Sequence, residues 1–98
     1  MKVNLVATIL DFDENPILEE DNQPLLLRKA CVVSLSTPLD EDRGLSPEKV
    51  VERWNLAMRI NSGGDGFELT PEAVTAIRAR IPKCYTLVPA GRALQLLT

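Results

Sequence analysis

Two helix-start signals of the same type constrain this chain more than any other feature. Ser46-Pro47-Glu48 and Thr70-Pro71-Glu72 each place a hydroxyl at the cap position, a proline at the first helical position and an acid in the first turn. Apolar residues follow each start at helical spacing, and the glycine-rich "NSGGDG" between them favours a helix end in the left-handed conformation. The sequence therefore predicts helices over about 46–61 and 71–81, with Pro82 ending the second.

Trp54 is the only tryptophan of the chain and lies in the first of these helices. Its apolar neighbours at helical spacing are Val50, Val51 and Met58. This spacing predicts that Trp54 is buried in the core. It also makes Trp54 a secondary candidate for a protein contact, because tryptophan is frequent at binding hot spots. Arg53 and Arg59 on the same helix are expected to face water.

The N-terminal third of the chain favours extended structure. Residues 2–10, "KVNLVATIL", alternate in character and predict a strand. The following "DENP" has turn chemistry, and "PILEE" can return as a second, shorter strand. Residues 25–36 fit either a helix or a strand, and we favour a helix from about 26 to 36. No internal repeat is convincing.

The remaining elements complete a small mixed fold. The last segment, "YTLVPAGRALQLLT", has the leucine spacing of a helix, and Pro89 and Gly91 indicate a late start or a kink. Phe67 and Leu69 belong either to a short strand or to a packed loop. A length of 98 residues with a hydrophobic fraction of 45% predicts a single domain, residues 1–98. The expected fold class is α+β, with an N-terminal β-hairpin packed on three to four short helices.

The residue inventory argues against catalysis. The chain has no histidine, and Cys31 and Cys84 fit no metal-ligand spacing, so both are expected to be small buried apolar residues. The serines lack a base partner, and "GGDG" lacks the lysine and the hydroxyl residue of a phosphate loop. The carboxylates fall in expected turns, where solvent leaves pKa values near normal. We predict no enzyme activity and no cofactor.

The stretch "DFDENPILEEDNQP" begins as a calcium loop does, with Asp11, Asp13 and Asn15 at alternate positions. The sixth position of such a loop requires glycine and here is Pro16. The twelfth position requires a bidentate glutamate and here is Asn22. We therefore interpret the stretch as a solvated turn rather than a metal site.

Charge is divided unevenly along the chain. Residues 1–45 hold nine acids and four bases, whereas residues 46–98 hold five acids and seven bases. An acidic half disfavours nucleic acid as the partner and favours a protein with a basic surface. The candidate partner-binding residues are Asp13, Glu14, Glu19, Glu20, Asp21, Asp40, Glu41 and Asp42.

DNA is an alternative partner. The bases available to contact phosphates are Arg78, Arg80, Lys83 and Arg92. The connection that precedes the helix over 71–83 is about eight residues, longer than the three to four of a helix-turn-helix. The net charge of −3 is also adverse. No apolar run approaches the roughly 20 residues that cross a bilayer, and no signal peptide is recognisable, so we expect a cytoplasmic protein without a membrane partner.

Four stretches together resemble a group of small proteins encoded by tailed bacteriophages and prophages. They are "ATILDFDENPI", "QPLLLRKACVVSL", "VERWNLAMRI" and "ELTPEAVTAIRARIPKCYTLVPAGRALQLL", which cover most of the chain. The chain departs from the group at "QPLLLR", where threonine is usual, and at Pro89, where an apolar residue is usual. The group has no assigned activity, so the resemblance implies a viral origin and carries over no functional residues.

These observations lead to one leading hypothesis and two alternatives. We expect a non-enzymatic phage-type protein in the host bacterial cell that works by protein–protein contact, for example as an inhibitor of a host defence protein or complex. The first alternative is a DNA-binding regulator that uses the basic helix over 71–83. The second is a virion or tail assembly component. The sequence leaves the oligomeric state open.

Overall fold

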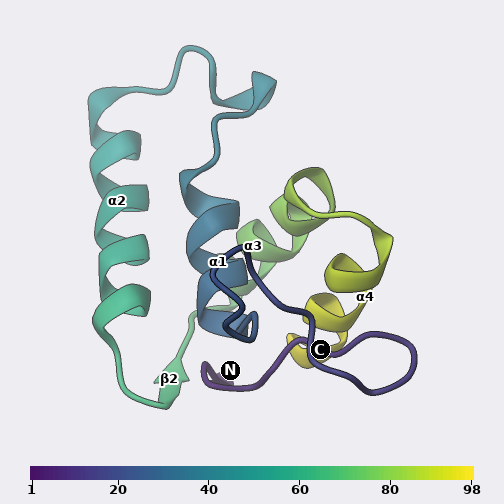
Figure 1. Ribbon diagram of the computed structural model, residues 1–98. Coiled ribbons are helices and arrows are strands. Elements are labelled where there is room, and N and C mark those ends of the chain that lie inside the picture. Colours follow the sequence, from purple (N-terminus) through teal and green to yellow (C-terminus); the bar gives the residue numbers. More distant parts are fainter.

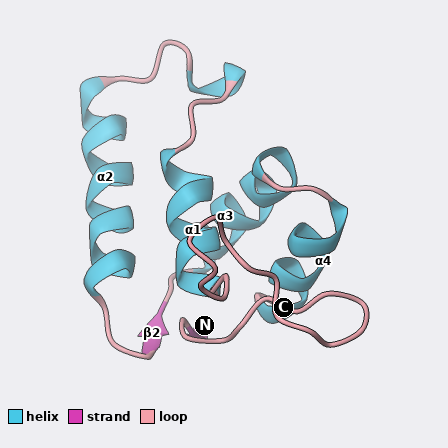
Figure 2. Cartoon of the chain, viewed as in Figure 1, coloured by secondary structure: helices cyan, strands magenta, loops and turns pink.

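Four α-helices and one two-stranded antiparallel sheet make up the computed structural model, which describes residues 1–98 (Figures 1 and 2). In chain order the elements are β1 Lys2–Asn4, α1 Leu27–Ser36, the 3₁₀ turn η1 Asp40–Asp42, α2 Pro47–Ser62, β2 Gly66–Glu68, α3 Pro71–Cys84 and α4 Leu87–Leu96. The expected α+β class, with an antiparallel pair of strands at the N-terminus and four helices, is confirmed. The second strand predicted at "PILEE" does not form a regular strand, and this segment has only the isolated bridges Leu10↔Pro16 and Leu18↔Pro24. The segment that fitted either a helix or a strand forms α1, as favoured.

The regular sheet pairs the N-terminus with the segment that joins α2 to α3. β1 and β2 are antiparallel in the register Lys2↔Glu68, Val3↔Phe67 and Asn4↔Gly66. β1 is shorter than the strand predicted over 2–10, because the chain turns where the Asn4 carbonyl accepts the N–H of Ala7 (3.2 Å). Phe67 therefore belongs to a short strand, which was one of its two predicted alternatives.

Residues 9–24 form two successive eight-residue units, "ILDFDENP" and "ILEEDNQP". Glu14 and Asn22 hold the same position in the two units, and both have left-handed backbone, with φ of 62° and 63°. In each unit the third N–H donates to the seventh carbonyl, in Asp11 to Asn15 (2.9 Å) and Glu19 to Gln23 (2.8 Å). The prediction that the chain has no internal repeat is therefore wrong. The two units share a backbone conformation, but most of their turn residues differ, so the repeat is hard to recognise in the sequence.

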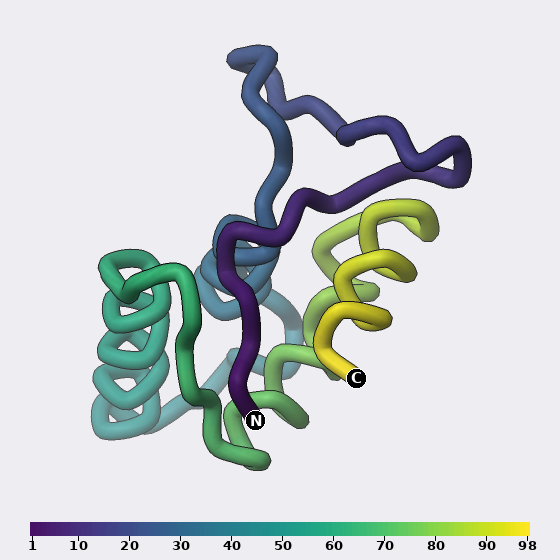
Figure 3. Tube along the Cα trace, turned by 90° about the horizontal axis from the view of Figure 1, so that it is seen from below, coloured from purple at the N-terminus to yellow at the C-terminus, as the bar shows by residue number.

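The first residues of the two units close a ring of backbone hydrogen bonds with Leu25. Ile9 N–H donates to Leu25 O (2.8 Å), Leu25 N–H to Ile17 O (2.8 Å) and Ile17 N–H to Ile9 O (3.0 Å). Ile9 and Leu25 are buried, and Ile17 packs against the core. We call residues 9–25 the acidic arm. It extends outward beside α4 and returns to α1 (Figure 3).

α1 lies at the centre of the fold and contacts the other three helices (Figure 1). Its buried residues include Ala30, Cys31 and Leu35. Burial raises the pKa of the Cys31 thiol to about 12, so this residue is protonated at neutral pH and packs as a small apolar side chain. Cys31 is therefore buried as expected, whereas Cys84 is only partly buried.

α2 stands at one side of the molecule and has a single fully buried residue, Ile60 (Figure 1). Arg28 of α1 holds its C-terminal end by donating to the carbonyls of Ile60 (2.6 Å), Gly63 (2.6 Å) and Gly64 (3.1 Å). Carbonyls at a helix end lack intrahelical donors, and Arg28 supplies them. Gly63 is the residue at the C-terminal cap of α2, and its φ is −71°. The prediction of a left-handed conformation at this helix end is therefore wrong.

Prolines fit into both C-terminal helices. α3 continues through Pro82 to Cys84, so the predicted end at residue 81 is wrong. The N–H of Tyr85 bonds to the Ile81 carbonyl (3.1 Å) and holds this helix end beyond the proline. Pro89 lies in the first turn of α4, where N–H groups have no intrahelical acceptor, so it removes no helical hydrogen bond. No helix of the protein has both the length and the apolar character that crossing a membrane requires.

The close packing at Gly63 can be tested by substitution. A Cβ at Gly63 would lie 2.7 Å from Phe67 Cδ2 and 2.9 Å from the Arg59 carbonyl oxygen, whereas a Cβ at Gly64 meets nothing within 4 Å. We expect Gly63→Ala to lower the free energy of unfolding by about 1–3 kcal/mol, because the Arg59 carbonyl belongs to α2 and cannot move aside. Gly64→Ala is the matched control and should leave the urea midpoint equal or slightly higher. Equal midpoints for the two variants would contradict this packing.

Candidate protein-binding surfaces

The two turns of the acidic arm are stabilised by their own carboxylates. Asp11 Oδ1 accepts the N–H groups of Asp13 (2.9 Å) and Asn15 (3.0 Å) in the first turn. Asp21 Oδ1 accepts the N–H of Gln23 (3.1 Å) in the second. Side chains of this type commonly hold turns in place by bonding to the backbone a few residues ahead. The stretch that begins like a calcium loop is therefore a pair of turns in which carboxylates bind backbone N–H groups.

α4 holds the first turn through one arginine. The Arg92 guanidinium donates to the carbonyls of Leu10 (3.2 Å) and Asp11 (3.1 Å) and pairs with Glu14 (3.2 Å). At this fixed turn Phe12 is 80% exposed, which is unusual for a phenylalanine. The arm thus presents an aromatic side chain to solvent on a backbone that is anchored to a helix.

The second turn forms one rim of a surface hollow of about 590 Å³. Glu19, Glu20 and Asp21 line this rim, and none of them forms an ion pair with a cation of the chain. The apolar and aromatic part of the lining consists of Ile17, Leu18, Leu25, Val33, Tyr85 and Pro89. Lys29 also lines the hollow. A hollow lined by both apolar side chains and carboxylates is suited to the aliphatic stem and charged head of a lysine or arginine.

Tyr85 supplies a polar group to this hollow. Burial raises its pKa to about 12, and the negative charge of Glu19 acts in the same direction. The phenol is therefore protonated across the physiological range and is able to donate a hydrogen bond. The sequence does not single out Tyr85, because nothing local connects it to the arm.

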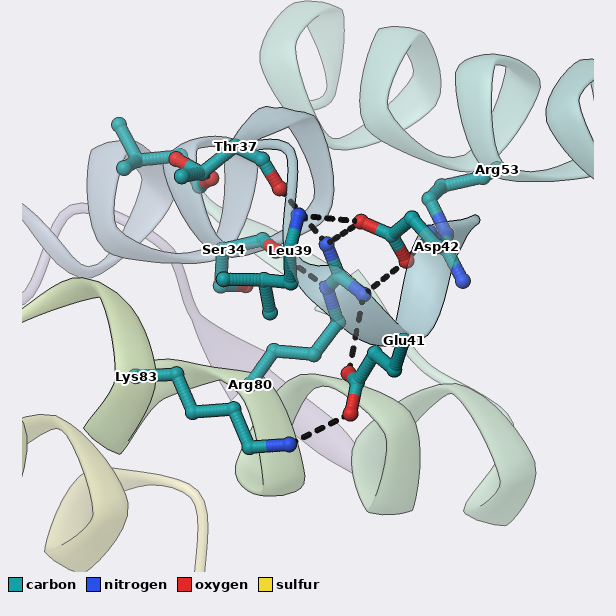
Figure 4. A network of polar contacts seen from close by, with 9 residues as sticks. Ser34, Thr37, Leu39, Glu41, Asp42, Arg53, Arg80 and Lys83 are labelled. Carbon is teal, nitrogen blue, oxygen red and sulfur yellow. Dashed lines mark hydrogen bonds and ion pairs between the residues drawn. The ribbon is translucent and has the colours of Figure 1, made fainter. Parts of the chain in front are cut away.

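A buried arginine organises the other side of the molecule (Figure 4). The Arg80 side chain is 4% exposed and donates to both carboxylate oxygens of Asp42 (2.8 and 2.9 Å). It also donates to the carbonyls of Ser34 (2.5 Å) and Thr37 (2.9 Å) and pairs with Glu41 (3.3 Å). Bidentate arginine–carboxylate pairs of this kind combine strong hydrogen bonding with fixed geometry.

Asp42 receives further donors and completes what we call the Arg80 cluster, namely Glu41, Asp42, Arg53, Arg80 and Lys83. Arg53 of α2 bonds to Asp42 Oδ1 (2.6 Å), and the Leu39 N–H bonds to Oδ2 (2.9 Å). The hydrogen bond from Arg80 is the largest of the effects that hold the pKa of Asp42 far below its usual value. The expectation of a normal carboxylate in a solvated turn is therefore wrong for Asp42, and the expectation that Arg53 faces water is wrong as well.

The Arg80 cluster changes which predicted acids remain available to a partner. The Asp42 side chain is only 17% exposed, and Glu41 binds both Arg80 and Lys83. Asp40 remains almost fully exposed, with only a long contact of 3.7 Å to Arg43. Of the eight predicted partner-binding acids, those in the arm therefore form the more accessible group.

The four predicted DNA-contacting bases all bind groups of this chain. Arg78 donates to the Leu94 carbonyl (2.8 Å) and to Thr98 (3.2 Å). The other three bind groups elsewhere in the chain: Arg80 binds Asp42, Lys83 binds Glu41 and Arg92 binds the arm. Phosphate groups would have to compete with these intramolecular contacts.

α2 carries a second exposed surface, which we call the α2 stripe: Val50, Val51, Trp54 and Met58. Trp54 is 61% exposed and the three aliphatic side chains are between 45% and 55% exposed. The prediction that Trp54 is buried is therefore wrong, because α1 covers only the side of α2 that carries Leu56, Ala57 and Ile60. Helical spacing identifies an apolar face but does not say whether another element covers it.

A groove of about 460 Å³ lies beside this stripe, between α2 and the segment that follows α1. Val50, Trp54 and Ala57 line it from α2, and Pro38 and Leu45 line it from the facing segment. Asp42 and Arg53 of the Arg80 cluster also contribute to its lining. The ion pair between Arg53 and Asp42 (2.6 Å) therefore joins the two walls of the groove.

No protein-family model, curated protein or solved structure matches this chain. No group of three or more cysteine or acidic side chains is arranged to hold a metal ion. The structure presents two exposed surfaces, the acidic arm with its hollow and the α2 stripe with its groove.

The Arg80–Asp42 pair makes stability depend on acid pH. The folded-state pKa of Asp42 is depressed, so its contribution is fully present above the ordinary carboxyl value of 3.8 and is lost as pH falls from there toward the folded value. Asp42→Asn should lower the free energy of unfolding by about 3–5 kcal/mol at neutral pH, because Arg80 is left buried without its counter-charge. Urea unfolding of both proteins at a series of pH values should show this difference shrinking below pH 4.

Asp40→Asn is the control for this experiment, because Asp40 is exposed and belongs to the same 3₁₀ turn. Its stability should stay close to that of the wild type at every pH. A difference between wild type and Asp42→Asn that stays constant down to pH 2 would contradict the assignment of the pH dependence to Asp42.

Proposed function

We propose that this protein is a non-enzymatic, phage-type binding module that contacts a basic protein through its acidic arm. The observation that carries the proposal is the hollow at the second turn, which Glu19, Glu20 and Asp21 line together with apolar side chains. These carboxylates have no cationic partner within the chain, unlike Glu14, Glu41 and Asp42. Their charge is therefore available to a partner.

A basic side chain of a partner would gain two kinds of interaction in this hollow. Its aliphatic stem would pack on the apolar side chains, and its charged head would reach the carboxylates, to which charge-assisted hydrogen bonds are about twice as strong as neutral ones. The protonated phenol of Tyr85 adds a donor for a carbonyl of the partner backbone. Together these groups recognise an exposed lysine or arginine on a protein surface.

The first turn enlarges this contact surface. Phe12 is exposed at the turn that Arg92 anchors, with Asp11 and Asp13 on either side in the sequence. An anchored backbone loses less conformational freedom on binding than a mobile one, and aromatic residues frequently dominate interface energies. The repeat thus offers one turn with an apolar contact and one with a charged contact.

The resemblance to small phage and prophage proteins supports a role inside an infected bacterial cell. An acidic, anchored surface is able to occupy a basic groove that otherwise holds nucleic acid, because carboxylates pair with the same lysine and arginine side chains that bind phosphates. The protein would then inhibit a host defence protein or complex by occupying its basic groove. This role agrees with the acidic charge, the anchored arm and the expected phage origin.

Charge reversal in the arm tests the proposal. Tagged wild type and the triple variant Glu19→Lys, Glu20→Lys, Asp21→Lys are used in parallel to capture proteins from a bacterial lysate, and the captured partner is then titrated at several salt concentrations. We expect the variant to bind the partner at least about tenfold more weakly, because attraction becomes like-charge repulsion. Its binding should also lose most of the salt dependence that the wild type shows.

A second triple variant changes the net charge equally at other exposed sites: Glu52→Lys, Asp65→Lys, Glu72→Lys. It should retain the partner with a smaller loss of affinity, because these residues lie outside the arm and its hollow. Equal losses in the two triple variants would mean that net charge alone governs capture. Unchanged binding by the arm variant would overturn the proposal.

A further inference from the structure

The α2 stripe has a pattern that is complementary to itself. Val50, Trp54 and Met58 are spaced by four residues, and Val51 lies beside them, so they form one continuous apolar face along the helix. No charged residue interrupts this face. Trp54 lies near its middle, with Val50 one turn before it and Met58 one turn after it.

Two copies of α2 that cross in antiparallel fashion at Trp54 would pair this face with itself. Residues four positions before and after Trp54 would then be opposite each other, so that Val50 of one copy meets Met58 of the second. The two tryptophans would meet at the two-fold axis. An interface of this isologous type requires a self-complementary patch, and the α2 stripe provides one.

The charges beside the stripe are complementary in the same arrangement. Glu48 and Arg59 are eleven residues apart, which is about three helical turns, so they lie on the same flank of α2. A two-fold axis places each flank against the same flank of the partner, in reversed direction. Glu48 of one copy then lies within about one residue rise of Arg59 of the other.

This arrangement forms the Glu48–Arg59 contact twice, once at each end of the interface. In a parallel two-fold arrangement each flank would instead lie against the opposite flank of the partner, so Glu48 and Arg59 would not meet. The two Glu48–Arg59 contacts therefore favour the antiparallel orientation. Glu48 forms no ion pair within its own chain, and Arg59 contacts only the face of the Phe67 ring, at 5.7 Å from its centroid.

We propose that this protein forms a homodimer in which the α2 helices of two copies pack antiparallel across the α2 stripe, with Trp54 at the two-fold axis. The acidic arm lies beside α4, on the opposite side of α1 from α2 (Figures 1 and 3). Both arms therefore stay exposed and lie away from the interface. Their negative charges do not oppose dimer formation from there. The dimer presents two arms, which is an arrangement that increases avidity for a partner with two basic sites.

Sedimentation of the full chain from micromolar to near-millimolar concentration tests the assembly. We expect a reversible dimer of twice the 10.8 kDa monomer mass. Fluorescence of the single tryptophan should shift to shorter wavelength over the same concentration range, because Trp54 passes from water into an apolar interface. Trp54→Glu should weaken dimerisation by about 30-fold or more while keeping the wild-type circular dichroism spectrum, since the side chain is exposed in the monomer.

Charge exchange tests the orientation. Glu48→Arg and Arg59→Glu should each weaken dimerisation by about tenfold, because each creates two like-charge contacts. Mixing these two variants should restore association, since the all-basic flank of one then meets the all-acidic flank of the other. The double variant Glu48→Arg, Arg59→Glu should also dimerise as the wild type does.

Three results would overturn the dimer and each has a distinct meaning. A monomer at every concentration would show that two copies do not use the stripe. A ring-sized oligomer would indicate an assembly component with a different interface. Failure of the mixed variants to associate, with dimerisation intact in the wild type, would show that the antiparallel pairing is wrong. None of these results affects the arm, because Glu19, Glu20 and Asp21 lie outside α2.

Discussion

The bidentate pair between Arg80 and Asp42 is the interaction on which the arrangement of the helices depends. Arg80 is buried on α3, and Asp42 lies in the 3₁₀ turn that leads toward α2, so the pair joins two parts of the chain that are far apart in sequence. Arg53 adds α2 to the same carboxylate. A buried guanidinium without its counter-charge is strongly destabilising. The 3₁₀ turn is therefore held where Asp42 pairs with Arg80.

α2 is held by two arginines in addition to the packing of Leu56, Ala57 and Ile60. Arg53 holds the middle of the helix through Asp42, and Arg28 holds its C-terminal end through the terminal carbonyls. Polar anchoring of this kind lets a helix stay in place while a wide apolar face remains uncovered. The same principle applies to the acidic arm, which Arg92 fixes to α4 while Phe12 stays exposed. Arginine contacts therefore add to core packing in holding both candidate surfaces in place.

Local features of the fold were predictable, and long-range ones were not. The hydroxyl–proline–acid starts of α2 and α3 act within one turn, and Ser46 and Thr70 accept the N–H groups of Lys49 and Ala73 as their positions predict. The Arg80–Asp42 pair spans 38 positions, and no local pattern marks it. The repeat in the arm left a faint signal, because only the Ile-Leu pairs, the aspartates Asp13 and Asp21, and the prolines recur. The acidic arm was identified as a candidate surface from charge, but the hollow beside it depends on Tyr85 and Val33, which approach only in the folded chain.

The sequence by itself determined the fold class, the helix starts, the absence of histidine chemistry and the concentration of acid in the N-terminal third, because these follow from local backbone preference and composition. The tertiary structure alone decided which apolar face is covered and which charges are already paired. Trp54 has the spacing of a core residue and is exposed, while Asp42 has the setting of a solvated turn and is bound by two guanidinium groups. Helical periodicity and turn chemistry specify what a residue can face, and only the packing of α1 against α2 and of Arg80 against Asp42 specifies what it does face.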